Sequence, residues 1–266
     1  MRLTPRVEEG QGLSIGRPLL EVRDVRVRYG GVEAVAGASV AIDAPQIVGL
    51  IGPNGAGKSS LLAAIGGQAE SASGRVLIGG KDVTHLSSYL RARLGIVRTF
   101  QTASVFDGLT VFENLLVAGT GEKGATLRGA VIGQRRHPAR AATVRVRAEE
   151  TLEEFDLWPI ADHYGRELSG GQRRLVEIAR CLMRAPRLLL LDEPMVGVAP
   201  HLVLRIGEHC RRICDRGVGI VIVEHSLEVV RAVCDRVLVM AAGQVIHDGP
   251  YDAVLTSDSV KEAYLA

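Results

Sequence analysis

The sequence predicts an α/β fold in which short buried strands alternate with helices around a glycine-rich loop. Apolar runs of strand length recur along the chain, among them QIVGLI (46–51) and RLLLLDE (187–193). Helical spacing of apolar residues follows several of these runs. The glycine-rich stretch GPNGAGKSS (52–60) lies between one such strand and one such helix. These three observations are typical of an open parallel sheet that binds ligands at the carboxyl ends of its strands.

The other elements follow in a definite order. Residues 1–17 have no sustained period, so we expect a flexible leader before one domain of residues 18–266. A block of helices is expected at about residues 110–182, within an otherwise strand-rich chain. The expected strands, hairpins and final helix are LLEVRDVRVRYG (19–30), ASVAID (38–43), a hairpin in SGRVLIGGKDV (73–83), IVRTF (96–100), GIVIVEH (219–225), the helix SLEVVRAVCDRV (226–237), and a hairpin in RVLVMAAGQVIHDG (236–249).

Composition narrows the class of protein. The chain has 266 residues, a formal net charge of +2 and 47% hydrophobic residues, so it can build a sizeable core. A general nucleic-acid binder would carry more positive charge, and we expect no nucleic acid partner. No apolar run approaches the ~18–20 residues that span a bilayer, and the first 17 residues lack the apolar stretch of a signal peptide. A cytoplasmic protein is therefore expected.

The four cysteines follow no C-x-x-C pattern. Cys210 and Cys214 share a helix face beside His209, which leaves a metal site open as an alternative. In a cytoplasmic chain, however, buried free thiols are far more common, and we expect all four cysteines, Cys181, Cys210, Cys214 and Cys234, to be of this kind.

GPNGAGKSS fits the pattern G-x-x-x-x-G-K-[ST] at every fixed position. Glycines let backbone N–H groups wrap around phosphates, Lys58 neutralises the β and γ oxygens, and the Ser59 hydroxyl is a ligand for Mg²⁺. A plain glycine-rich turn is the alternative, and the correct flanking strand and helix disfavour it. The predicted nucleotide-binding residues of this loop are Gly52, Pro53, Asn54, Gly55, Ala56, Gly57, Lys58, Ser59 and Ser60.

A second anion site is predicted at LSGGQ, where Ser169, Gly170 and Gly171 open a helix. Free N–H groups and the helix dipole point outwards at such an N-terminus. The chain therefore has two predicted phosphate-binding sites, the loop 52–60 and the helix start at LSGGQ, which we call its two cradles. A single bound nucleotide needs only one such site for its phosphates.

Five further residues are suited to phosphoryl transfer or to binding a nucleotide base. Asp192 and Glu193 end an apolar strand, where the first can hold Mg²⁺ and the second can polarise an attacking water. His225 ends another strand and could meet them at the same sheet edge, and Gln101 can offer an amide to Mg²⁺ or water. Tyr29 ends a strand at a place where an exposed ring could stack on a purine. Taken alone, a histidine such as His225 more often has a structural role, Gln101 is uninformative, and an ordinary strand aromatic is an equally good interpretation of Tyr29.

Together these motifs resemble the ATP-binding subunit of ABC transporters, from about residue 19 to the end. The resemblance implies a P-loop NTPase core of the ABC ATPase type, with an antiparallel β subdomain and an inserted α-helical subdomain. It implies ATP hydrolysis with Mg²⁺. In one departure, Ala199 stands near the position of the family's D-loop aspartate. The implied roles are adenine stacking for Tyr29, Walker A for Gly52 to Ser60, Q-loop for Gln101, signature for Leu168, Ser169, Gly170, Gly171 and Gln172, Walker B for Asp192, catalytic base for Glu193 and switch histidine for His225.

The resemblance also accounts for the two cradles. Two subunits arranged head to tail around a two-fold axis would each lend LSGGQ to the γ-phosphate bound by the other. The implied partners are a second ATP-binding subunit, identical or paralogous, two membrane-spanning permease subunits, and a periplasmic or extracellular solute-binding protein. The expected location is the cytoplasmic face of the inner membrane.

Within this family, four segments are similar to the branched-chain (hydrophobic) amino acid uptake group: RTFQ (98–101), LTVFENLLVA (109–118), GVAP (197–200) and AYLA (263–266). Lipopolysaccharide exporters and urea or short-chain amide importers are the alternatives. Soluble ABC ATPases of ribosomes or DNA repair usually have two cassettes or a long coiled coil, and neither pattern occurs here. A dinucleotide-binding oxidoreductase is disfavoured by the Lys-Ser pair.

One basic segment, residues 121–147, has seven Lys and Arg residues against one acid, Glu122. A solvated loop is the leading interpretation, and a patch facing anionic lipid headgroups is the alternative.

Overall fold

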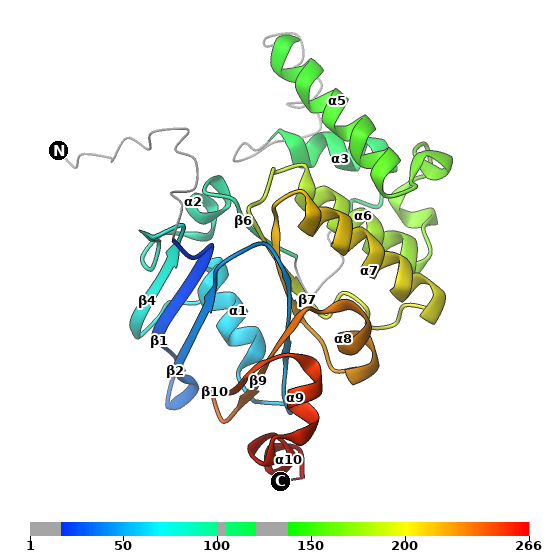
Figure 1. Cartoon of the computed structure of the whole chain (residues 1–266). Helices are drawn as coiled ribbons and strands as arrows, with labels where there is room; N and C mark the ends of the chain where they lie inside the picture. The colour runs from blue at the N-terminus through cyan, green and yellow to red at the C-terminus, as the bar shows by residue number, and fades with distance from the viewer. Residues whose placement is uncertain (1–16, 100–104, 121–137, 266) are drawn as a thin grey trace, which may run out of the picture.

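Two β-sheets lie on either side of a central helix in this chain (Figure 1). The computed structural model describes residues 17–99, 105–120 and 138–265. The predicted leader, Gln101 and most of the basic segment therefore lie outside the described residues. The prediction of an α/β fold is confirmed.

The larger sheet has six strands in the order β10-β9-β3-β8-β7-β6. Every residue of β3, β7 and β8 is buried, as expected for parallel strands that are covered on both faces. β3 pairs in parallel with β8 and β9, and β7 pairs in parallel with β8 and β6, so these strands end at one edge. The bounds are Gln244–Gly249 for β10, Arg236–Ala241 for β9, Ile47–Ile51 for β3, Gly219–Val223 for β8, Leu188–Asp192 for β7 and Ile96–Arg98 for β6.

The smaller sheet is antiparallel and has the order β2-β1-β4-β5. Its strands are β1 (Leu20–Tyr29), β2 (Val32–Ile42), β4 (Ser73–Ile78) and β5 (Lys81–Asp82). The hairpin expected at residues 73–83 is present, because Ile78 pairs with Lys81 across Gly79-Gly80. β2 is longer than the expected strand at residues 38–43. It begins directly after the turn at Gly30-Gly31, where Tyr29 pairs with Val32, and its first residues are exposed and lack the alternation on which the prediction relied.

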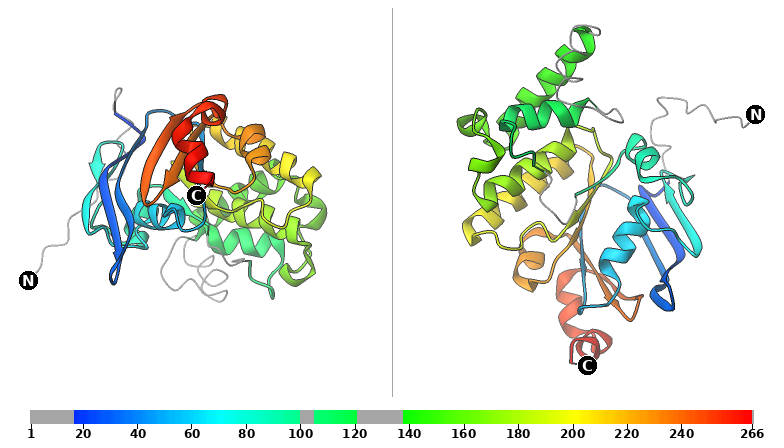
Figure 2. Two further views of the ribbon diagram at one scale, coloured as in Figure 1. Left: turned by 90° about the horizontal axis from the view of Figure 1, so that it is seen from below. Right: turned by 180° about the vertical axis from the view of Figure 1, so that it is seen from behind.

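Helix α1 (Lys58–Gly66) packs between the two sheets, as both views in Figure 2 indicate. Its apolar residues Leu61, Leu62 and Ile65 belong to one buried cluster with residues of both sheets. The short helix α2 (Ser88–Arg93) follows the antiparallel sheet in the chain and contacts the C-terminal end of α1. On the other face, a second cluster joins the central sheet to helices α6 (Gly170–Leu182) and α7 (Pro200–Asp215).

Residues 111–182 hold α3 (Val111–Gly119), α5 (Pro138–Glu154), two short 3-10 turns (Trp158–Ile160 and Gly165–Glu167) and α6. Figures 1 and 2 show these helices gathered on the side of the molecule away from the antiparallel sheet. Helix α3 begins with a capping box, in which Thr110 and Glu113 each bond the other's backbone N–H. That local signal fixes where the helical region starts after the central sheet.

The C-terminal part consists of α8 (Leu227–Val233), the β9–β10 hairpin, α9 (Tyr251–Thr256) and α10 (Asp258–Leu265). The helix expected over residues 226–237 is wrong at its end, because α8 stops at Val233. Arg236 and Val237 instead pair with β3, and Asp235 accepts a hydrogen bond from the Ile47 N–H. The strand expected at 96–100 likewise ends at Arg98 among the described residues. No described helix is long and apolar enough to cross a membrane.

Candidate nucleotide-binding site

The phosphate loop Gly52–Ser60 leads from the end of β3 into α1, and its shape is fixed by close backbone approach. Gly52 has a φ of 147°, and a Cβ there would lie 2.1 Å from the carbonyl oxygen of Met240. Gly57 has a φ of 97°, and a Cβ there would lie 2.2 Å from the carbonyl oxygen of Ala34. Both positions therefore require glycine, and the loop is held between the ends of β9 and β2.

The N-terminus of α1 is available to an anion. Gly57 caps the helix in the left-handed conformation and supplies no side-chain hydrogen bond. The first N–H groups of any helix have no partner within it, and here the helix dipole adds partial positive charge. This end of α1 is thus suited to phosphate, as the sequence predicted.

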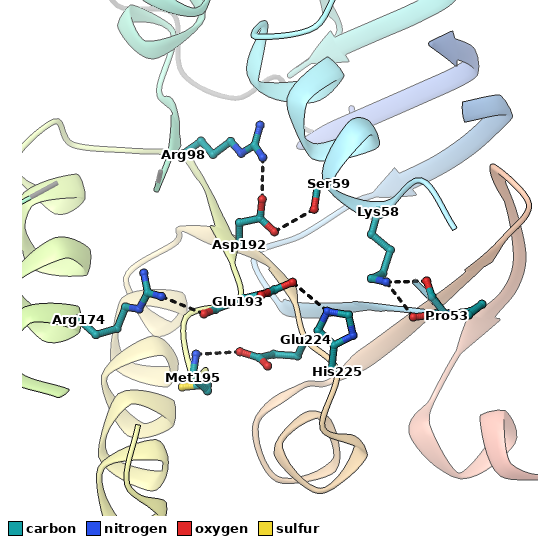
Figure 3. Close-up of polar contacts among 11 residues, drawn as sticks. Pro53, Lys58, Ser59, Arg98, Arg174, Asp192, Glu193, Met195, Glu224 and His225 are labelled. Atoms are coloured by element: carbon teal, nitrogen blue, oxygen red, sulfur yellow. Dashed lines mark hydrogen bonds and ion pairs between the residues drawn. The ribbon is translucent and has the colours of Figure 1, made fainter. Parts of the chain in front are cut away.

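Lys58 folds back over the loop. Its Nζ donates to the carbonyl oxygens of Gly52 at 2.8 Å and Pro53 at 2.9 Å (Figure 3). Burial lowers the pKa of Lys58, and the nearby charges of Glu193 and Asp192 act in the opposite direction. A bound phosphate would add negative charge beside the ammonium group and favour its charged form.

Asp192 lies fully buried at the end of β7, and both of its carboxylate oxygens have partners. Oδ1 accepts from the Ser59 hydroxyl at 3.3 Å, and Oδ2 pairs with Nη2 of Arg98 at 2.7 Å. The Asp192 N–H donates to the Thr99 hydroxyl. The neighbouring oxygens of Ser59 and Asp192 are hard ligands of the type that Mg²⁺ prefers.

These two oxygens fit a magnesium ion that is shared with a nucleotide. Among the described residues, no group of three or more His, Cys, Asp or Glu side chains could hold a metal alone. Mg²⁺ usually takes one or two protein ligands together with substrate phosphates, so a two-ligand site beside the phosphate loop matches that pattern. Gln101, the third predicted ligand, lies outside the described residues.

Glu193 and His225 meet at the same edge, as expected if their strands are neighbours. Oε1 of Glu193 lies 2.8 Å from Nε2 of His225, and the strands that precede them, β7 and β8, are adjacent (Figure 3). Glu193 has a φ of 50°, which is uncommon for a residue with a Cβ. Its side chain is about one-third exposed, at 35%, so water can reach it.

Three residues that sequence reasoning missed complete the surroundings of the two carboxylates. Arg98 pairs with Asp192, and Nη2 of Arg174 donates to the Glu193 carbonyl oxygen at 3.1 Å. Glu224 accepts from the Met195 N–H at 2.9 Å, and burial raises the pKa of this carboxyl group. For Arg98 and Glu224 the only available signal was their place at the ends of apolar strands.

The second predicted cradle opens α6. The Ser169 hydroxyl accepts from the Gln172 N–H, and the Gln172 side chain accepts from the Ser169 N–H, which makes a capping box. Ser169 and Gly170 are exposed, whereas Leu168 is buried. Gly171 lies against α7, where a Cβ would meet Leu202. The two cradles thus belong to different helices.

The structure also describes the surroundings of Tyr29, Ala199 and the four cysteines. Tyr29 ends β1 with 53% of its surface exposed, so its ring is free to stack. Ala199 caps α7 and offers no side-chain hydrogen bond. All four cysteines are free thiols, as expected, but only Cys210 and Cys214 are buried, whereas Cys181 and Cys234 are partly exposed. Burial raises the pKa of Cys210 to about 12.

The chain is similar to known proteins over nearly its whole length. The family model described as "ABC transporter" matches residues 35–196. The chain is similar to the lipopolysaccharide export system ATP-binding protein of Haemophilus influenzae, with 35% identity over 93% of this chain and 97% of that protein. It is also similar to the high-affinity branched-chain amino acid transport ATP-binding protein of Pseudomonas aeruginosa, with 32% identity over 94% of this chain and 99% of that protein.

A probable branched-chain amino acid transport ATP-binding protein of Archaeoglobus fulgidus is 34% identical over 93% of this chain and 95% of that protein. Among solved structures, the ADP conformation of an ATP-binding cassette of an ABC transporter has a TM-score of 0.82 and 34% identity, over 94% of this chain and 99% of that chain.

Proposed function

This chain belongs to the ABC transporter family as an ATP-binding subunit that hydrolyses ATP, and from that premise we propose that it powers the uptake of branched-chain or related hydrophobic amino acids. Closure of an ATP-bound dimer is the driving step. The observation that carries the hydrolytic part is the Glu193–His225 hydrogen bond beside the phosphate loop.

In this proposal each residue at the edge of the central sheet has one task. Lys58 and the N-terminus of α1 hold the phosphates, Glu193 polarises the attacking water, and His225 orients Glu193. Ser59 and Asp192 would hold Mg²⁺, which neutralises phosphate charge during transfer. Tyr29 and Gln101 keep the roles predicted from the sequence, adenine stacking for Tyr29 and a further ligand to metal or water for Gln101.

The segment Leu168–Gln172 acts on the nucleotide of the partner subunit. Two features support this role: Ser169 and Gly170 are exposed at the start of a 13-residue helix, and that helix is distinct from α1. In a head-to-tail dimer each α6 N-terminus would face the γ-phosphate bound by the other subunit. ATP then bridges the subunits, and hydrolysis removes the bridge.

An ABC transporter ATP-binding subunit dimerises and works with membrane permease subunits. For this chain we propose a second ATP-binding subunit, identical or paralogous, two membrane-spanning permeases and a periplasmic or extracellular solute-binding protein. The subunit would lie on the cytoplasmic face of the inner membrane, bound through the permeases. No nucleic acid partner is proposed.

The choice of solute is supported by two relatives of nearly full length whose names refer to branched-chain amino acid transport. The segments RTFQ, LTVFENLLVA, GVAP and AYLA agree with them. Lipopolysaccharide export is the second candidate, because a relative with that name is 35% identical over 247 residues.

Reconstitution tests the solute directly. The subunit would be co-purified with the permeases that bind it and placed in proteoliposomes with the proposed solute-binding protein. We expect ATP-dependent import of labelled leucine, isoleucine or valine, and no import when the subunit carries Lys58→Ala. Import of urea or a short-chain amide, or ATP-dependent extraction of lipopolysaccharide without amino acid import, would contradict the proposal.

A further inference from the structure

Arg174 connects helix α6 to the backbone of Glu193. It lies one turn after the exposed N-terminus of α6, and its side chain crosses to the segment that follows β7 (Figure 3). Nη2 donates to the carbonyl oxygen of Glu193 at 3.1 Å, and Nη1 pairs with Oε2 of Glu177 at 2.6 Å. The Arg174 side chain is 16% exposed and that of Glu177 is 3% exposed. This bridge is therefore largely shielded from water.

Glu193 is held through all three of its polar groups. Its N–H donates to the Val223 carbonyl oxygen at 3.0 Å, and its carboxylate bonds His225. Its carbonyl oxygen accepts from Arg174 at 3.1 Å and from the Val196 N–H at 3.4 Å. Its left-handed backbone is rarely adopted by residues with a Cβ and persists only where neighbouring groups enforce it. Val223 and His225 belong to β8 and the segment after it. Val196 lies in the turn after β7. Among these four contacts, the one from Arg174 alone links Glu193 to a helix.

We propose that Arg174 is a positioning residue that makes the orientation of Glu193 depend on the position of α6. This inference rests on the proposed function, in which the N-terminus of α6 meets the γ-phosphate of the partner's nucleotide. Contact at Ser169 would then be passed through α6 and Arg174 to the subunit's own Glu193. Ala199 offers no carboxylate for a second route between the sites.

Arg174 also neutralises the buried carboxylate of Glu177, and the test must separate the two roles. Glu177→Gln removes the charge of the partner and keeps the Arg174–Glu193 contact. The double variant Arg174→Met/Glu177→Gln differs from it only at residue 174 and leaves no orphaned charge in the buried pair. Arg173→Met is a second control, because Arg173 lies on the same turn and bonds Asp107 and the Gly165 carbonyl oxygen instead of Glu193.

The measurement is the steady-state ATPase rate together with the equilibrium affinity for ATP. We expect kcat of the double variant to fall about 10- to 100-fold relative to Glu177→Gln, since small misplacement of a catalytic group has effects of this size. The dissociation constant for ATP should change less than about twofold, because Glu193 acts on water and not on binding. Arg174→Lys keeps the positive charge without the planar fork of the guanidinium group. Its kcat should therefore lie between that of Glu177→Gln and that of the double variant.

Closure is measured separately by light scattering in a Glu193→Gln background. There the double variant should still dimerise with ATP as its control does. If the double variant does not fold, the inference stands only where kcat of Arg174→Lys lies clearly below that of Glu177→Gln. A kcat equal to that of Glu177→Gln, or an equal loss in Arg173→Met, would overturn the inference. Absence of ATP-dependent closure in the otherwise unchanged Glu193→Gln chain would instead count against the proposed function.

Discussion

Asp192 and Glu193 are neighbours in the chain, yet their surroundings at the end of β7 differ. The Asp192 side chain is fully buried and has ionic or hydrogen-bonding partners on both oxygens. The Glu193 side chain is 35% exposed and has His225 as its partner. A buried carboxylate held at both oxygens suits a fixed metal ligand, whereas a carboxylate open to solvent suits the activation of water.

Replacing each carboxylate by its amide should therefore impair different functions: hydrolysis for Glu193 and Mg²⁺-dependent binding for Asp192. Glu193→Gln keeps the shape and removes the charge, so kcat should fall about 10²- to 10⁴-fold while ATP binds and a closed dimer accumulates. Asp192→Asn should leave hydrolysis-independent binding of metal-free ATP intact and weaken the gain in affinity that Mg²⁺ provides. Calorimetric titration with and without EDTA, and light scattering of the dimer, distinguish the two. Equal defects in both variants would show that the roles are not separated.

The residues in local motifs could be predicted because glycine, lysine, serine and paired carboxylates have special chemistry at fixed spacing. Arg98, Arg174 and Glu224 could not, since their partners lie 94, 19 and 29 residues away in the chain. An arginine or glutamate is exposed by default. The strand order places Arg98 and Glu224 beside the carboxylates, and the packing of α6 on the central sheet places Arg174 there.

At the scale of single elements, helix α1 is fixed at both ends. Its N-terminus is set by the phosphate loop, and its C-terminus by Gly67 in the left-handed conformation and by the buried Arg91 of α2. Nη1 of Arg91 donates to the carbonyl oxygens of Ala64 and Ile65 in the last turn of α1, and Nη2 donates to that of Thr84. A cation at a helix C-terminus also opposes the negative end of the helix dipole.

Arg91→Met should destabilise the fold without altering the phosphate loop. Buried carbonyl groups would lose their donors, and each such loss costs about 1–3 kcal/mol, so we expect a decrease of about 3 kcal/mol or more in the free energy of unfolding. Arg93→Met removes the exposed arginine of the same helix and should change it by less than about 0.5 kcal/mol. Urea denaturation measures both. A small effect at residue 91 would mean that water replaces the guanidinium.

The elements whose bounds were predicted wrongly share one cause. The end of α8 and the start of β2 are both decided by pairing with another strand: Arg236 and Val237 pair with the distant β3, and Val32 pairs with Tyr29 of the preceding strand across a glycine turn. Helical periodicity continues past Val233 in the sequence, but from Arg236 onwards the chain forms strand β9 of the central sheet. Buried strands such as β7 and β8 were predicted well, because a run of four large apolar residues needs no partner to be recognised.

At the scale of the whole molecule, the two cradles on α1 and α6 can be tested by mixing defective subunits. Ser169→Arg spoils the cradle of α6, and Lys58→Ala spoils that of α1. A heterodimer of the two places both defects in one composite site and leaves the other site intact. We expect partial ATPase activity from a mixture of two inactive parents, and Ser169→Ala, which removes the same helix cap without the bulk, should be less impaired than Ser169→Arg. A fully active Ser169→Arg parent would exclude the role of this segment in the partner's site.

The central position of β3 has a consequence for how the chain is made. The phosphate loop follows β3 near the start of the sequence, but the strands on either side of it, β8 and β9, come from the last fifth of the chain. Contacts between such distant segments form slowly, because a long loop must close first. At a synthesis rate of ~5–20 residues per second, the apolar residues of β3 wait on the order of ten seconds or more on the ribosome before either neighbour exists. The nascent chain thus exposes a strand that is wholly buried in the folded protein throughout this interval, and a truncation before Gly219 should yield an aggregation-prone polypeptide that has no nucleotide site.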